Sequence, residues 1–169
     1  MSEIKKKYQV GQVRPSQLLW TYGPGALIDL PNISVVTMGL EKWDLEKCTP
    51  IFESRLLEAV RKAVHSNVTK LLSPPLAQAD NPNPYTPEGL IGVPVRPFPT
   101  WLRCVNCGRL GKYDGNIFKV QHNAFHPERT HFYHDNCPKS VKGKAEAVPA
   151  RFLVACPHGH LDDFPWRWI

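Results

Sequence analysis

The feature that most constrains this chain is the cysteine pair in Cys104-Val105-Asn106-Cys107. Two cysteines separated by two residues can direct both sulfurs at one tetrahedral metal ion, because a tight turn points both side chains the same way. Gly108 follows directly and suits such a turn, since glycine readily takes a positive φ. The segment therefore predicts one half of a metal site, and the other half must come from a distant part of the chain.

Two later cysteines are the obvious donors of that second half. We predict a structural zinc site whose ligands are Cys104, Cys107, Cys137 and Cys156. The fourth ligand stays open between Cys156 and three histidines. His134 precedes Cys137 at the spacing of a cysteine knuckle, whereas His158 and His160 follow Cys156 closely.

Other uses of these cysteines fit the sequence less well. A redox Cys-X-X-Cys motif is normally followed by a helix, whereas Arg109-Leu110-Gly111-Lys112 is short and interrupted by glycine. The chain has five cysteines, an odd number, and shows no signal-peptide pattern, which favours a reducing compartment over a disulfide framework. Cys48 has no partner at ligand spacing, so we expect a buried or partly buried free thiol there.

Composition predicts one folded but loop-rich domain. The chain has 169 residues, of which 42% are hydrophobic, enough for a real core. Its 17 prolines are about twice the usual share and favour short extended pieces. We therefore expect an α+β fold, a small mixed domain that is proline-rich, with short strands, one amphipathic helix and a zinc-knuckle-like site.

The periodicity of apolar residues places the main elements. Residues 26–30 and 34–38 read as two strands of a hairpin, because Pro31-Asn32 between them is typical turn chemistry. Apolar residues recur at helical spacing over about 53–66 and predict a helix that faces the core. Prolines interrupt residues 91–99 and favour a sheet edge or a position outside a sheet, and residues 150–155 read as a buried strand.

These elements suggest three parts of one domain. We expect a basic N-terminal tail over 1–10 with Lys5-Lys6-Lys7, a hairpin-plus-helix subregion over 11–76, and a loop and zinc-knuckle subregion over 77–169. Trp166, Trp168 and Ile169 make an unusually apolar end, so we expect the domain to be truncated there.

The charge balance favours acidic partners. The formal net charge is +6, and nucleic acid is a typical acidic partner of such a chain. Arg103, Arg109 and Lys112 flank the first cysteine pair and are the candidate phosphate contacts. No apolar run approaches the roughly 20 residues that span a bilayer, so we expect a cytoplasmic protein without a membrane segment.

An enzyme is the competing hypothesis. Histidines together with Asp162 and Asp163 could serve a metal-dependent hydrolase or nuclease, which would need an open metal position and a general base. The sulfur-rich ligand set favours a closed site instead, and the acidic pair is well suited to begin a short helix. We therefore expect no catalytic residues.

Several phrases together resemble a known family. They are Arg14-Pro15-Ser16-Gln17-Leu18-Leu19, the segment Gly23 to Pro31, Phe98-Pro99-Thr100-Trp101 with the cysteine pair, Val148-Pro149-Ala150-Arg151-Phe152, and Cys156-Pro157-His158-Gly159-His160-Leu161-Asp162-Asp163-Phe164-Pro165-Trp166. The chain resembles the opening region of the DrmB family, the helicase-associated core proteins of the DISARM anti-phage defence system.

The resemblance implies a non-catalytic partner of DrmA, a superfamily-2 helicase, in a pair that binds DNA and acts with a methyltransferase against phage DNA. It also implies a second Cys-X-X-Cys at Cys137-Pro138-Lys139-Ser140, where this chain has serine. Ser140 cannot supply a thiolate, so either Cys156 or a histidine takes its place or the metal site is weakened.

Overall fold

The fold is described from a computed structural model that covers residues 10–11, 13–64, 67–77 and 83–168. The chain divides into two compact units, residues 1–38 together with 95–169, and residues 39–94. Apart from Val10, the basic tail predicted over residues 1–10 lies outside the described residues. None of the helices in the described ranges is long and apolar enough to cross a membrane.

A three-stranded antiparallel sheet opens the first unit after the short helix α1 (Pro15–Trp20). Its order is β1-β2-β5, from β1 (Leu27–Leu30), β2 (Ile33–Thr37) and β5 (Val95–Pro97). Leu30 pairs with Ile33 across the Pro31-Asn32 turn, so the predicted hairpin is confirmed. The proline-interrupted strand β5 lies at an edge, as expected, because a central strand would need the amide hydrogens that proline lacks.

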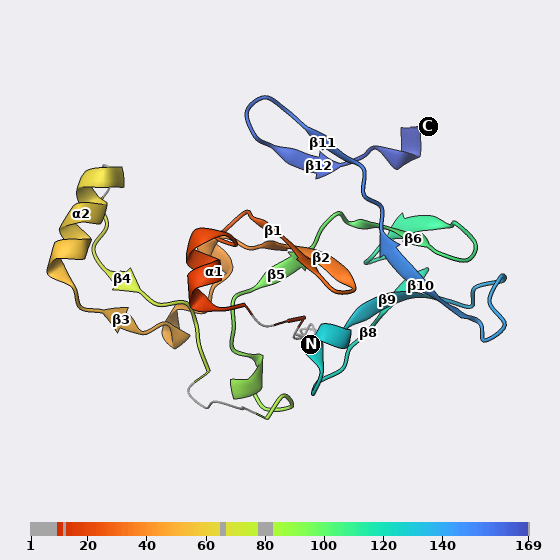
Figure 1. The fold of residues 1–169 in the computed structure, drawn as a ribbon, viewed down its shortest axis with the longest axis horizontal. Coiled ribbons are helices and arrows are strands. Elements are labelled where there is room, and N and C mark those ends of the chain that lie inside the picture. Colours follow the sequence, from red (N-terminus) through yellow and green to blue (C-terminus); the bar gives the residue numbers. More distant parts are fainter. Residues whose placement is uncertain (1–9, 12, 65–66, 78–82, 169) are drawn as a thin grey trace, which may run out of the picture. The chain divides into compact units, whose positions relative to one another are not determined.

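The larger sheet of the first unit has five antiparallel strands in the order β7-β6-β10-β9-β8. Figure 1 labels β6, β10, β9 and β8 of this sheet. These strands are β6 (Trp101–Cys104), β7 (Leu110–Lys112), β8 (Phe118–Gln121), β9 (His131–Asp135) and β10 (Lys144–Pro149), with the 3-10 turn η4 (Pro127–Arg129) before β9. Strand β10 is central and pairs with both β6 and β9, although it follows them in sequence.

The two sheets share one core. Its buried side chains come from β1 and β2 on one side and from the five-stranded sheet and its following turn on the other: Ile28, Ile33, Val35, Leu102, Cys104, Phe118, Phe132, Cys137, Ala145 and Ala147. The alternation of buried and exposed residues along β6, β9 and β10 leaves one face of the larger sheet open to solvent. Two of the predicted metal ligands thus belong to the hydrophobic core.

A separate hairpin follows β10 and consists of β11 (Leu153–Ala155) and β12 (Leu161–Asp163), then the 3-10 turn η5 (Trp166–Trp168). The strand predicted over 150–155 is shorter than expected and half-buried to exposed, because it pairs with β12 alone. Asp162 and Asp163 lie in β12, so the expectation that they begin a helix is wrong. The Asp163 carboxylate accepts hydrogen bonds from the amide and the hydroxyl of Thr100, which fastens the hairpin to the start of β6.

The second unit contains the predicted amphipathic helix, α2 (Ser54–Val64), between β3 (Pro50–Ile51) and its partner β4 (Leu71–Leu72). The 3-10 turns η1 (Leu40–Lys42), η2 (Leu45–Lys47) and η3 (Glu88–Leu90) complete it. No residue of α2 is buried, so the expectation that this helix faces the core is wrong for the part of the chain described. Besides α2, the described part of this unit has a two-residue strand pair and short turns, and the residues of α2 are half-buried or exposed.

The boundary between the units differs from the predicted division at residues 76 and 77. The hairpin β1–β2 belongs with the cysteine-bearing sheet and not with α2. The physical reason is the pairing of Thr37 with Val95, which closes the three-stranded sheet across a long excursion of the chain. Sequence proximity had grouped the hairpin with the helix.

Leu102→Ala tests the shared core. Leu102 is 1% exposed and lies on β6, beside the central strand of the larger sheet. Removing its branched side chain leaves a cavity, and we expect the free energy of unfolding to fall by about 2–5 kcal/mol. Urea unfolding followed by tryptophan fluorescence measures it. The control is Val141→Ala, a fully exposed apolar position, which should change stability by less than about 0.5 kcal/mol; equal effects of both variants would contradict the core described here.

Candidate metal centre

The first two candidate ligands lie at the end of β6 and in the turn that follows. Cys104 is the last residue of β6, and the chain reverses over residues 105–107 into β7. The Gly108 amide donates to the Cys104 carbonyl at 3.0 Å, and the Cys104 amide donates to the Arg109 carbonyl at 2.9 Å. Gly108 has a φ of 76°, as the sequence led us to expect of a knuckle turn.

The second pair of candidate ligands comes from β9 and the turn after it. His134 is buried on β9, and Cys137 follows Asn136, which has a φ of 58°. Asparagine tolerates this left-handed conformation better than most residues. The Cys137 amide donates to the Gly143 carbonyl at 2.7 Å, so the turn is closed against the start of β10.

Strand β10 brings the two turns together. Strands β6 and β9 each run antiparallel to β10. They therefore run in the same direction, and their C-terminal ends lie at the same end of the sheet. Ala147 pairs with Cys104 and Ala145 pairs with His134. These two small, buried residues occupy the strand between the ligands and leave room for larger groups beside them.

The four side chains form a compact cluster. The ligand atoms of Cys104, Cys107, His134 and Cys137 all lie within 4.8 Å of one another and could hold a metal ion. The Sγ atoms of Cys104 and Cys137 are 3.7 Å apart, and Cys107 Sγ is 3.4 Å from His134 Nδ1. A tetrahedral zinc ion separates two sulfurs by about 3.8 Å and a sulfur from a nitrogen by about 3.6 Å. The donor set fits one such ion.

Burial and hydrogen bonding change the pKa values of the cysteines in this cluster. Burial raises the pKa of Cys104, but hydrogen bonds from the Cys107 backbone and the His134 side chain outweigh it and bring the pKa to about 6. Burial raises the pKa of Cys137, and the neighbouring sulfurs raise it further. One thiolate is therefore formed first, and a cation would favour loss of the remaining protons. The ring of Phe118 meets the His134 ring edge-on at 5.6 Å and holds it in place.

The structure unites three of the four predicted ligands and places His134, not Cys156, with them. Cys156 directly follows β11, and its sulfur is 3.2 Å from His160 Nδ1. His158 is exposed in the same turn. The hydroxyl of Ser140 donates to the Lys144 carbonyl. The signal for His134 was the His-X-X-Cys spacing to Cys137, one of the alternatives that the sequence had left open.

The other candidate residues lie outside the cluster. Arg103, Arg109 and Lys112 are exposed, Arg103 and Lys112 on strands β6 and β7 and Arg109 in the first turn. Asp162 and Asp163, the acidic pair of the enzyme hypothesis, lie on β12, and neither belongs to the metal-ligand cluster. Cys48 is a buried free thiol of the second unit, as expected, and burial raises its pKa.

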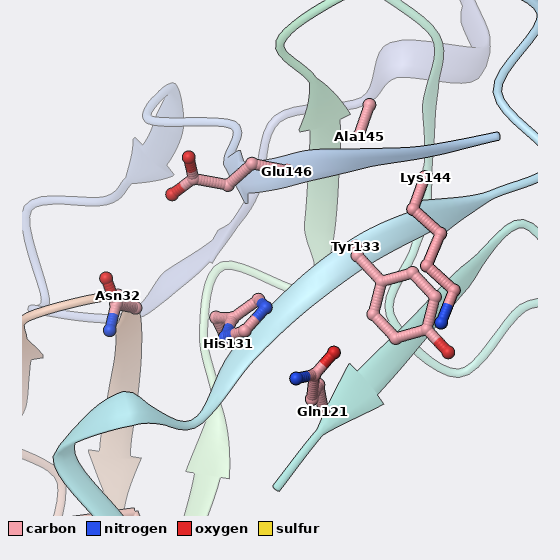
Figure 2. A pocket seen from close by; sticks show the side chains of 7 residues that line it. All are labelled: Asn32, Gln121, His131, Tyr133, Lys144, Ala145 and Glu146. Carbon is pink, nitrogen blue, oxygen red and sulfur yellow. The ribbon is translucent and has the colours of Figure 1, made fainter. Parts of the chain in front are cut away.

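A polar hollow of about 310 Å³ lies on the other face of the larger sheet (Figure 2). His131 and Tyr133 reach it from β9, because they alternate with the buried Phe132 and His134. The ammonium of Lys144 lies over the Tyr133 ring, 4.8 Å from its centre. The sheet itself separates this hollow from the cysteine cluster, so it supplies no group to the metal site.

Replacement of His134 by alanine distinguishes the two candidate ligand sets. We expect His134→Ala to lose tightly bound metal, as Cys104→Ser should, because either change opens the tetrahedral set and exposes a buried charge. Cys156→Ser should keep the chelator-resistant metal ion, and Cys48→Ser is the matched cysteine control. Elemental mass spectrometry after treatment with a chelator measures it; loss from Cys156→Ser with retention in His134→Ala would contradict the arrangement described.

Comparisons with known proteins agree with the family resemblance noted in the sequence. DISARM protein DrmB of Bacillus paralicheniformis (strain ATCC 9945a / NCIMB 11709 / CD-2) is 28% identical over 143 residues, which are 83% of this chain and 20% of that protein. The chain thus spans about a fifth of the curated relative, and the predicted resemblance to DrmB is confirmed. The sequence profile of a domain of unknown function, DUF8724, matches residues 14–169. This chain belongs to the DUF8724 family.

Proposed function

We propose that this domain is a zinc-stapled, non-catalytic binding module of a DISARM-type anti-phage defence complex. In this proposal it partners a DrmA-like helicase subunit in the cytoplasm and supports the binding of foreign DNA. The observation that carries the structural part is the buried cluster of Cys104, Cys107, His134 and Cys137. The similarity to DISARM protein DrmB carries the biological part.

The chemistry of the donors supports zinc in a structural role. Three thiolates and one imidazole are a common structural zinc set, and a catalytic zinc keeps an open position. Here four protein donors would complete the tetrahedral coordination of the ion. Cys104, His134 and Cys137 are each no more than 3% exposed. A bound zinc ion would cross-link the turn after β6 to the turn after β9. The chain's own residues supply the position, the thiolate charge and the exclusion of water.

The same arrangement weighs against the hydrolase alternative. A hydrolytic zinc site needs a position for water and a nearby carboxylate or histidine as general base. Asp163 is engaged by the amide and hydroxyl of Thr100, and the acidic pair lies apart from the cluster. We therefore assign no catalytic role to these residues.

Exposed cations near the first turn support contact with DNA. Arg103 and Lys112 project from adjacent strands, and Arg109 lies beside the knuckle, so a rigid metal-bound turn would fix their spacing. Arginine and lysine contacts to phosphate neutralise charge, release counterions and make affinity fall steeply with salt. Such contacts are independent of sequence, so they would add affinity for DNA of any sequence.

Charge neutralisation tests the DNA contact. In the full-length protein we expect Arg109→Gln with Lys112→Gln to weaken DNA binding and to make the slope of log K against log salt shallower by about 2, one contact for each side chain. Fluorescence anisotropy across a salt series measures it, with metal content checked in each sample. Lys42→Gln with Lys47→Gln removes the same charge from the second unit. Equal slopes for wild type and the Arg109/Lys112 variant would remove these residues from the interface.

Disruption of the cluster tests the role in defence. We expect full-length protein carrying Cys104→Ser with Cys137→Ser to lose protection against phage in a plaque assay, because the unit that presents the basic surface loses its cross-link. Cys48→Ser should retain protection. Co-purification with the helicase subunit, measured on the same cells, should fall with the cluster variant. Full protection by a cluster variant shown to lack metal would contradict a structural zinc role.

A further inference from the structure

A second pair of metal-ligating side chains lies at the tip of the β11–β12 hairpin. Cys156 follows β11 directly, and His160 directly precedes β12. Cys156 Sγ and His160 Nδ1 are 3.2 Å apart, close to the 3.4 Å between Cys107 Sγ and His134 Nδ1 in the first cluster. Neither Cys156 nor His160 belongs to that first cluster. The pair is therefore a separate arrangement of the same donor chemistry.

The turn that holds this pair resembles the turn of the first cluster. The Gly159 amide donates to the Cys156 carbonyl at 3.0 Å, and the Cys156 amide donates to the His160 carbonyl at 3.1 Å. Gly159 has a φ of 83°, comparable with 76° at Gly108. In both turns a glycine folds the chain back so that a cysteine and a second donor face one point. These backbone hydrogen bonds close the turn that carries both donors.

The pair lies where the hairpin has least support of its own. The base of the hairpin is held by Asp163 on Thr100 and by rings that meet at 4.9–6.2 Å, those of Phe152, Phe164 and Trp166. Only three pairs of residues join β11 to β12 below the tip, and the residues of the tip are half-buried or exposed. A two-stranded ribbon is marginal in water. A metal bridge across the tip would join the two strands where packing does not.

We propose that Cys156 and His160 form a second site for a divalent metal ion of the zinc type. The protein supplies a thiolate and an imidazole nitrogen, and water fills the two remaining tetrahedral positions. Because only two protein donors hold the ion and both are accessible, it exchanges faster and binds more weakly than an ion held by the four buried donors. This site does not depend on the proposed function of the first cluster.

Metal titration of the full-length protein tests the second site. With Zn²⁺ alone as the probe, in reducing buffer, we expect a second, chelator-labile equivalent beyond any chelator-resistant one. Cys156→Ser and His160→Ala should each weaken that equivalent at least about tenfold, since even outer-shell partners of metal ligands are worth 10–100-fold. His158→Ala, an exposed histidine of the same turn, is the matched control and should leave the second equivalent unchanged. With zinc kept in the first cluster, Co²⁺ added as the second equivalent should give a sulfur-to-metal absorption band that is absent from Cys156→Ser.

A measurement without variants completes the test. Zn²⁺ should slow the alkylation of Cys156 by iodoacetamide in wild-type protein, read by peptide mass spectrometry, and chelator should restore the rate. An unchanged alkylation rate at Cys156, or a second equivalent that survives both Cys156→Ser and His160→Ala, would overturn the proposal. Loss of metal from the first cluster alone would leave these readouts intact, so the two sites fail independently.

Discussion

The pairing of β10 with both β6 and β9 is the interaction on which the rest of the first unit depends. Because β6 and β9 each run antiparallel to β10, the two cysteine-bearing turns that follow them lie at the same end of the sheet. The small side chains of Ala145 and Ala147 then leave room for sulfur and imidazole at the core boundary. The backbone ladder sets the position of the cluster, and a metal ion would strengthen an arrangement that hydrogen bonding already defines. The pairing of β6 with β7 in the same sheet sets the spacing of the basic residues on these two strands.

Part of the candidate site was predictable because its signal is local. The Cys104–Cys107 spacing and the following Gly108 specify a turn without knowledge of the remaining chain, and three of the four cysteines proposed as ligands do come together. The choice between Cys156 and His134 was different. It depends on which strands lie near β6 in the sheet. Strand order is a non-local property that spacing in the sequence does not encode. His134 lies on β9, two strands from Cys104 in the sheet. The chain leaves this sheet after β10, and Cys156 lies in the separate hairpin that follows.

The fold shows the same division between local and non-local information. The hairpin at residues 27–37 and the edge position of β5 follow from turn residues and prolines, which act within a few positions. The helix α2 was also recognisable from its period, but its environment was not. An amphipathic pattern indicates which face of a helix prefers burial, but it does not indicate whether other apolar surface is present to cover that face. Leu56 and Val64 remain about half exposed. The division into units likewise depended on the pairing of Thr37 with Val95.

That pairing has a consequence for how this domain can vary. Residues 39–94 leave the first unit after β2 and return to it at β5, so the excursion begins and ends at neighbouring positions of one sheet. The entropy of closing such a loop rises only with the logarithm of its length. Related chains can therefore lengthen, shorten or exchange this segment with little effect on the sheet that carries the cysteines. The second unit is inserted between two paired strands of the first, so a change in its length need not alter the sheet that carries the cysteines.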